Sequence, residues 1–112
     1  MSDTIFDKIL SGEIDSTEVY SDEHVYAFED ISPQAPVHVL VIPRRRIVNI
    51  GQMEESDVEV MGRLFFGAKK VAEKKGIEDF RVVMNSGAGA GQSVFHAHLH
   101  VIGGRDLSWP PG

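Results

Sequence analysis

The clearest pattern of apolar positions lies in residues 54–75, where apolar side chains recur at steps of three and four. This spacing places them on one side of an α-helix and predicts an amphipathic helix packed against a core. Gly76 follows the last turn, where glycine commonly ends a helix. The residues of this apolar face are Val58, Met61, Leu64, Phe65, Ala68, Val71 and Ala72.

Shorter segments have the composition and alternation of β-strands. These segments are residues 18–21, 25–29, 37–42, 79–85 and 95–102. A short helix is expected near the start, capped by Asp3, continuing through Ile9 and Leu10 and ended by Gly12. Short connections, antiparallel strands and few helices predict a single α+β domain over residues 1–112.

Every second residue in the middle of the last predicted strand is a histidine. These histidines are His96, His98 and His100. Side chains alternate between the two faces of a strand, so Ala97, Leu99 and Val101 are expected to face the core and the histidines the opposite side. Neutral imidazoles can act as nucleophile, general acid or base, or metal ligand. Chance or packing alone is a poor explanation for three of them in a row.

The spacing of the histidines favours phosphate over metal. Residues two apart on a strand are separated by about 6.7 Å, whereas zinc requires each ligand nitrogen at about 2.0–2.1 Å. Two neighbouring rings could share a metal, but three could not without a sharp bend, and the chain has no cysteine to complete the shell. We therefore expect no metal and no cofactor, and a phosphate ester as the ligand.

A glycine-rich segment, residues 87–91, precedes the histidine strand. Successive N–H groups in such a loop can surround anionic oxygens. A dinucleotide-binding motif is excluded because a strand, and not a helix, follows the glycines. A flexible hairpin connection remains the alternative. Asn85 and Ser93 flank the segment and offer an amide and a hydroxyl group to a phosphate or a leaving group.

Composition and charge exclude several classes of function. The formal charge of −6 argues against non-specific binding to nucleic acid. The run of arginines at 44–46 is a local exception, expected to be a solvated turn after Pro43. The absence of cysteine excludes disulfides and thiol chemistry. Because the chain has no apolar run of signal-peptide or membrane-span length, we expect a cytoplasmic protein that does not bind membranes.

The residues around the histidines resemble the histidine triad family, and more narrowly its branch of nucleotide-binding phosphoramidases. The resemblance rests on HAHLHV at 96–101, GQS at 91–93 and WPPG at 109–112, and extends through residues 3–6, 30–36, His38 and 41–43. It implies a five-stranded antiparallel sheet with one short and one long helix. It also implies a homodimer with the sheet extended across it, and an irregular tail at residues 103–112 near the interface.

The same resemblance implies a mechanism. His98 would attack the α-phosphate of a purine nucleoside phosphoramidate and form a covalent nucleotidyl-histidine, which water then hydrolyses. His96 and His100 would stabilise charge on the phosphoryl oxygens, and His38 would support the row and fix a tautomer. Ser93 would pass a proton to the departing amine.

The resemblance also implies a nucleotide site. An apolar slot for the purine would be lined by Phe6, Ile9, Phe28 and Ile31, and the Asp30 carboxylate would accept both ribose hydroxyls. The other residues expected at the nucleotide, besides His98 and His100, are Asn85, Gly91, Gln92, Ser93, Val94 and Trp109. Trp109 would lie near the active site of the partner subunit.

Two other functions remain open from the sequence. One is a dinucleoside polyphosphate hydrolase of the same family, which the short chain and the WPPG ending disfavour. The other is a nucleotide-binding adaptor with little catalysis, which the intact row of histidines disfavours.

Overall fold

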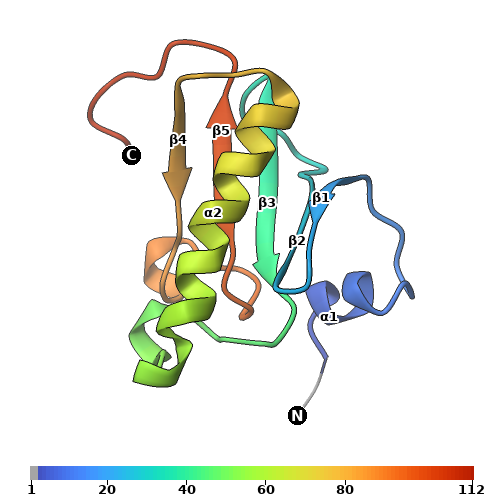
Figure 1. Ribbon diagram of the computed structural model, residues 1–112. Coiled ribbons are helices and arrows are strands. Elements are labelled where there is room, and N and C mark those ends of the chain that lie inside the picture. The colour runs from blue at the N-terminus through green and yellow to red at the C-terminus, as the bar shows by residue number, and fades with distance from the viewer. Residues whose placement is uncertain (1–2) are drawn as a thin grey trace.

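The computed structural model describes residues 3–112, which form a five-stranded antiparallel sheet with one long and one short α-helix (Figure 1). The strand order is β1-β2-β3-β5-β4. The strands are β1 Glu18–Ser21, β2 Val25–Glu29, β3 Val37–Pro43, β4 Phe80–Val83 and β5 Leu99–Gly103, and the helices are α1 Ile5–Leu10 and α2 Val58–Lys75. The predicted α+β fold is confirmed. Within residues 3–112, no helix is long and apolar enough to cross a membrane.

Helix α1 begins one residue later than the sequence predicts. Thr4, and not Asp3, is its N-cap, because the Thr4 hydroxyl accepts the Asp7 N–H while the Asp7 carboxylate accepts the Thr4 N–H at 2.8 Å. This reciprocal pair is a capping box and satisfies two N–H groups of the first turn. The helix ends at Leu10, with Ser11 as its C-cap.

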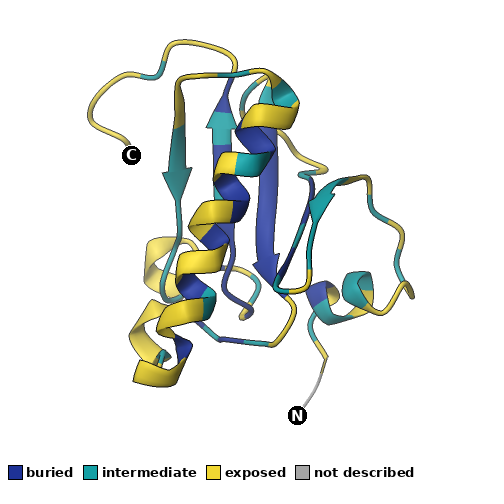
Figure 2. Ribbon diagram, in the orientation of Figure 1, coloured by how far each residue is buried: buried dark blue, intermediate teal, exposed yellow. Residues whose placement is uncertain are grey.

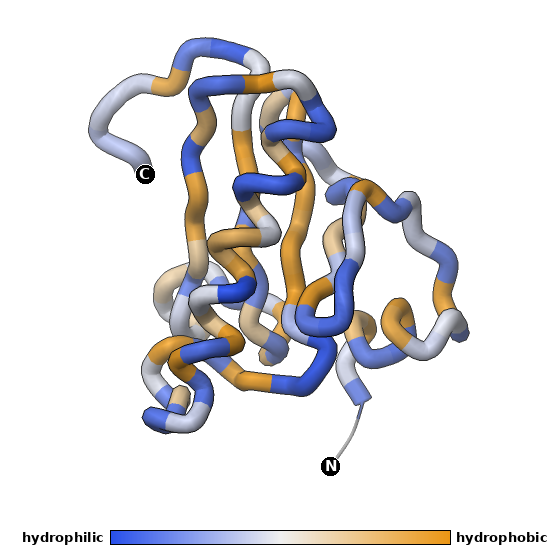
Figure 3. The backbone as a smooth tube through the Cα atoms, viewed as in Figure 1, coloured by the Kyte–Doolittle hydropathy of each residue, from blue (hydrophilic) through white to orange (hydrophobic). Residues whose placement is uncertain are grey.

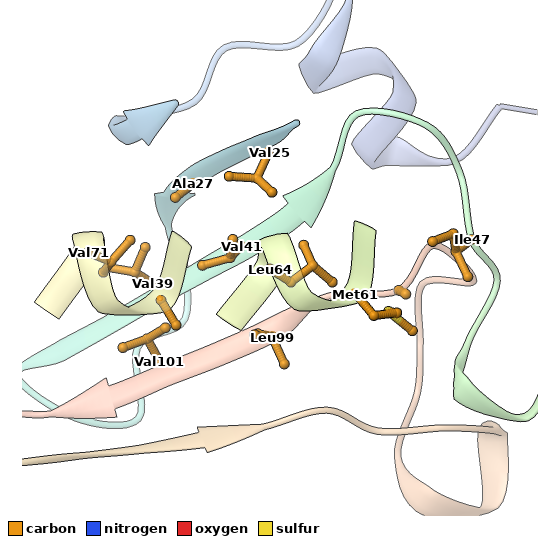
Figure 4. Close-up of a cluster of buried hydrophobic side chains, with 12 residues drawn as sticks. Val25, Ala27, Val39, Val41, Ile47, Met61, Leu64, Val71, Leu99 and Val101 are labelled. Atoms are coloured by element: carbon orange, nitrogen blue, oxygen red, sulfur yellow. The ribbon is translucent and has the colours of Figure 1, made fainter. Parts of the chain in front are cut away.

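Helix α2 packs on one face of the sheet and forms the main core with it (Figure 4). Its buried side is dark blue in Figure 2, and β3, the strand beneath it, is almost entirely buried and mostly apolar (Figures 2 and 3). Gly67 permits the close approach, because a Cβ there would lie 3.1 Å from both Val25 and Val41. The predicted apolar face was wrong at Val58 and Phe65, which are both 58% exposed.

The helix begins at Val58, and residues 55–57 form a separate 3-10 turn. The Asp57 side chain accepts the Glu54 N–H at 2.7 Å and pairs with Arg45 at 2.5 Å, which holds this turn in place. Burial of the Arg45–Asp57 pair is uneven: the carboxylate is mostly covered and the guanidinium is half exposed.

The opposite face of the sheet holds a smaller apolar cluster and the candidate active site. Alternation along β3 directs Val39 and Val41 toward α2 and His38, Leu40 and Ile42 the other way. Leu40 and Ile42 pack with Phe6 of α1 and Phe28 of β2. His38 and His100 are therefore placed on one surface by the periodicity of β3 and β5.

Strand β5 begins at Leu99, four residues later than predicted, so His96 and His98 precede it in an irregular segment. In that segment the Ala97 N–H donates to the Ile47 carbonyl at 2.6 Å rather than to a strand partner. Strand β4 ends at Val83, two residues early, at the last residue paired with β5. Beyond Gly103 the chain has no helix or strand, and it runs beside β4, at the far edge of the sheet from α1 (Figure 1).

Candidate active site

His98 is held in one tautomer by the backbone. Its Nδ1 lies 2.8 Å from the carbonyl oxygen of His96. A carbonyl can only accept a hydrogen bond, so Nδ1 carries the proton, and the neutral ring has its lone pair on Nε2. The ring is 6% exposed, and the edge-to-face ring of Phe6 lies 5.0 Å away between centroids. Its Nε2 is therefore prepared to act as a nucleophile.

His38 and His100 form a directed pair beside it. The Gln34 N–H donates to His38 Nδ1 at 2.9 Å, so the His38 proton must reside on Nε2. This Nε2 lies 2.9 Å from His100 Nδ1, which therefore accepts, and neutral His100 keeps its own proton on Nε2. The rings of His98 and His100 are 5.0 Å apart between centroids. This arrangement makes His100 a hydrogen-bond donor next to His98, and it brings His38 into contact with the histidines as the sequence predicts.

His96 does not share the open face with the other two histidines, so this part of the prediction was wrong. Its ring is fully buried, and its Nε2 lies 3.0 Å from the carbonyl oxygen of Pro43, to which it donates. Its Nδ1 is buried without a hydrogen-bond partner, 3.6 Å from an Asp7 carboxylate oxygen. The expected contact of this ring with phosphoryl oxygens does not fit its burial. His96 acts through its carbonyl, which orients His98.

Burial favours the neutral form of the His96, His98 and His100 rings. It lowers the pKa of His96 and that of His98, with the Asp30 carboxylate opposing the effect at His98. Burial, followed by the neighbouring His98 and His38 rings, lowers the pKa of His100 to about 4. A ring with a lowered pKa keeps its lone pair at mildly acidic pH.

Activity is therefore expected to persist to lower pH than an ordinary imidazole nucleophile would allow. The attacking nitrogen of His98 must be unprotonated, and protonation sets in only as the pH falls through its lowered pKa. We expect kcat/KM to stay level through about pH 6.5, the ordinary histidine value, and to fall in more acidic solution. A pH–rate profile from pH 8 to pH 4 measures this. A rate that keeps rising toward pH 4, or an acid limb centred at or above the ordinary value, would contradict the assignment.

An apolar cavity of about 540 Å³ is connected to the histidines through two of its lining residues, because Phe6 contacts the His98 ring and Asp30 contacts His38. The four predicted slot residues, Phe6, Ile9, Phe28 and Ile31, all line it, and so does Asp30, which was predicted to bind the ribose. Ile31 is 98% exposed at its rim. Sequence reasoning missed the other lining residues, which are Ile5, Ile14, Asp15, Ser16, Thr17, Glu29 and Leu40. Of these, Leu40 could have been found, because it lies two residues from His38 on the same face of β3.

Asp30 lies between this cavity and the histidines. One of its carboxylate oxygens accepts the Ser32 N–H at 2.7 Å, and the other lies 3.3 Å from His38 Nε2. Each oxygen retains a second lone pair, so the predicted bidentate contact with ribose hydroxyls is compatible with these bonds.

The glycine-rich loop is closed by its own hydrogen bonds. The N–H groups of Ala90, Gly91 and Gln92 donate to carbonyls of Gly87 and Ala88 at 3.0–3.1 Å. The expectation that successive N–H groups of this loop surround a phosphate is therefore wrong for these three groups, which are already bonded. Gly91 is required for its backbone, which has φ +96°.

Gln92 holds the loop from within. Its side chain is buried, donates to the carbonyls of Val48 and Val94, and accepts from Asn49 and from the Gly87 N–H. All its hydrogen-bonding positions are used, which contradicts a side-chain contact with the nucleotide.

The remaining predicted nucleotide residues differ in their exposure. Ser93 is exposed, and among residues 3–112 its hydroxyl has no hydrogen-bond partner. Val94 is partly buried against the Phe6 and Phe28 cluster. Asn85 is partly buried with its amide beside Gly91.

Trp109 is 81% exposed, in the tail on the β4 side, so within one protomer it does not reach the cavity beside α1.

Two curated plant proteins are similar to the chain over nearly its whole length. The maize "14 kDa zinc-binding protein" is 51% identical over 99% of this chain and 89% of its own. The Arabidopsis thaliana "Adenylylsulfatase HINT1" is 51% identical over 99% of this chain and 78% of its own.

The name of the maize relative raises the question of a metal site. Asp30, His38 and His100 offer ligand atoms within 4.8 Å of one another. A metal on His38 Nε2 would require a proton on Nδ1, donated to an acceptor. Here the Gln34 N–H points at Nδ1, so a proton on Nδ1 would face the proton of another hydrogen-bond donor. These three residues therefore do not fit a zinc site.

Two solved structures and a family model are also similar to the chain, and all three are named as HIT proteins. The HIT family hydrolase of Legionella pneumophila superposes with a TM-score of 0.93 and 43% identity, covering 98% of this chain and 100% of that one. The HIT family hydrolase of Clostridium thermocellum superposes with a TM-score of 0.92, covering 96% of each chain. The HIT domain model matches residues 11–107. With its paired histidines beside an apolar cavity, the chain belongs to the histidine triad (HIT) family of hydrolases.

Proposed function

We propose that the protein hydrolyses the P–N bond of purine nucleoside 5′-phosphoramidates, releasing a nucleoside monophosphate and an amine. The observation that carries this proposal is the hydrogen bond between His98 Nδ1 and the His96 carbonyl. It leaves a nucleophilic Nε2 beside a cavity of the size and polarity suited to a nucleoside.

The first step transfers the nucleotide to the protein. His98 Nε2 attacks the α-phosphorus, forming an N–P bond as the bond to the amine breaks. The Nε2–H of His100 donates to a phosphoryl oxygen and stabilises its growing charge. The amine departs with the electron pair and takes a proton from water, passed on by the Ser93 hydroxyl.

The second step restores the histidine. Water attacks the same phosphorus, and the electron pair of the N–P bond returns to His98 Nε2. The proton that this water loses neutralises the hydroxide left when the amine took its proton in the first step. Dividing one displacement into two lets each be assisted by the same groups. The net reaction consumes one water and releases the nucleoside monophosphate.

Adenylyl sulfate is a second candidate substrate, favoured by the Arabidopsis relative named as an adenylylsulfatase. It presents the same α-phosphorus to His98, and differs in its leaving group. Sulfate is a weak base and leaves without a proton, whereas an amine needs one.

Release of AMP from defined substrates tests the proposal. Adenosine 5′-phosphoramidate, adenylyl sulfate and a dinucleoside polyphosphate are compared, each with and without a chelator. We expect chelator-resistant release of AMP from the phosphoramidate with the highest kcat/KM of the three. Absence of AMP from the phosphoramidate would refute the proposal, and a clear preference for the dinucleoside polyphosphate would assign the protein to a different reaction.

Ser93→Ala separates the two leaving groups. Removing a proton-transfer group costs about 100-fold, and we expect this loss with the phosphoramidate and little loss with adenylyl sulfate. The ratio of the two kcat/KM values is the measurement, because a general disturbance of the site would lower both. An equal loss with both substrates would mean that Ser93 does not handle the proton.

We also propose that the protein is a homodimer with the sheet extended across it, as the resemblance implies, and that the two subunits are joined along β4. β4 pairs with β5 alone and leaves its other edge without a strand partner in residues 3–112. Phe65, Phe66 and Phe80 are 58%, 45% and 37% exposed on α2 and β4. Open strand edges and exposed apolar side chains are common at such interfaces. Sedimentation velocity at micromolar concentration should give twice the chain mass, and a monomer would contradict this.

A further inference from the structure

The first residues of the C-terminal tail are packed tightly against the loop that precedes β3. Gly104 has φ +87°, and a Cβ at this position would lie 3.0 Å from Cβ of Pro36 and 3.4 Å from the backbone nitrogen of Val37. Arg105 follows, and its Nη2 donates to the carbonyl of Gln34 at 3.2 Å. Two independent contacts thus join this part of the tail to residues 34–37.

The same loop supplies a group that sets the His38 tautomer, together with the Asp30 carboxylate 3.3 Å from Nε2. The Gln34 N–H donates to His38 Nδ1, and the Gln34 side chain donates to the Ser32 carbonyl at 3.0 Å. The Ser32 N–H in turn donates to Asp30. The charged and titratable groups that face His38 are Asp30 and His100, and neither of them touches Nδ1. Gln34 alone supplies the donor at that atom among the described residues.

The His38 tautomer decides what His100 offers to a substrate. With the proton on His38 Nε2, His100 accepts at Nδ1 and donates from Nε2. If His38 instead carried its proton on Nδ1, its Nε2 would accept, and neutral His100 would have to place its proton on Nδ1. His100 would then present a lone pair, which repels a phosphoryl oxygen, at Nε2.

We propose that Gly104 and Arg105 are positioning residues, which seat Gln34 against His38 and thereby keep His100 as a hydrogen-bond donor toward the transferred phosphoryl group. The consequence for the rate rests on the proposed hydrolysis, but the effect on the His38 tautomer does not. The tail thus acts on the site of its own protomer through Gln34 and His38, without touching substrate.

Nitrogen-15 NMR of the imidazole rings tests the tautomer directly, because protonated and unprotonated ring nitrogens resonate far apart. In the wild type we expect His38 to be unprotonated at Nδ1. In Arg105→Met we expect a measurable fraction with the proton on Nδ1, and in Gly104→Ala a larger one. Because Arg105 is exposed, Arg105→Met is expected to fold. If Gly104→Ala does not fold, Arg105→Met is sufficient for the test.

Arg81→Met is the matched control. Arg81 also donates to a tail carbonyl, that of Ser108 at 2.9 Å, but has no contact with Gln34. We expect its His38 signals to match those of the wild type. Unchanged His38 signals in Arg105→Met would overturn the proposal, and so would an equal change in Arg81→Met, since the effect would then belong to the tail as a whole.

Kinetics supplies the second measurement. Loss of one ordinary hydrogen bond is expected to lower kcat about fivefold in Arg105→Met, with KM changed much less, because the nucleoside cavity lies elsewhere. Arg105→Lys retains a donor and should recover part of the loss. An equal fall in kcat in Arg105→Met, Arg105→Lys and Arg81→Met would contradict positioning by Arg105. A wild type that hydrolyses none of the substrates would refute the proposed function while leaving the NMR result valid.

Discussion

Replacing His98 by alanine is expected to lower kcat/KM for adenosine 5′-phosphoramidate by about 10⁴-fold or more. The variant lacks the ring whose backbone hydrogen bond leaves an unprotonated Nε2 for attack on the phosphorus. The remaining groups can still bind the nucleotide and polarise the phosphate, so the loss should appear in kcat rather than in KM. Steady-state kinetics, together with nucleotide binding by calorimetry, separates these two effects.

His24→Ala is the matched control for this variant. His24 lies in the turn between β1 and β2, where its ring is 3.5 Å from the exposed Glu23 carboxylate. The same substitution there should leave kcat/KM within about twofold. Turnover of His98→Ala within tenfold of the wild type would show that another group forms the bond to phosphorus.

Replacing Gln92 by leucine is expected to lower the free energy of unfolding by roughly 3–5 kcal/mol. Leucine is close in size but leaves four partners without these hydrogen bonds, of which Asn49 is buried and the other three are partly buried. Two are the carbonyls of Val48 and Val94, at 2.7 and 3.0 Å, and two are the Asn49 amide and the Gly87 N–H, at 3.1 and 2.8 Å. Urea denaturation followed by circular dichroism measures the change.

Gln52→Leu provides the comparison, because Gln52 is exposed and only its backbone N–H makes a hydrogen bond with Asn49. We expect its stability to change by less than about 0.5 kcal/mol. A loss below about 1 kcal/mol in Gln92→Leu would show that the loop is held by its own backbone bonds.

Periodicity predicted the fold well where elements are regular. The bounds of β1 and β2 match the predicted ones, and β3 differs by one residue. It failed at the histidines because the alternation HAHLH continues beyond the strand. Residues 94–98 are bent by the bond from the Ala97 N–H to Ile47, a residue fifty positions away. No local pattern reveals such a partner, so the burial of His96 could not be predicted.

Long-range pairs account for most of the other differences. Residues 44–46 were expected to be a solvated turn, but Arg46 pairs with Asp7 and its side chain is only 17% exposed. In the glycine-rich loop, composition shows that the backbone is free to turn, but not which N–H groups are already bonded. Gln92 was assigned to the nucleotide by resemblance, whereas its environment assigns it to the loop. The cavity residues at 14–17 belong to an irregular segment and have no sequence signal.

The central claim is that His98 Nε2 becomes bonded to the phosphorus of the nucleotide during turnover. Mass spectrometry of a reaction quenched within the first turnovers, followed by proteolysis, tests it most directly. We expect a peptide containing His98 to gain the mass of one nucleotidyl group, and His98→Ala to lack the adduct. Rapid hydrolysis by the wild type with no such adduct, or an adduct on another histidine, would contradict the account.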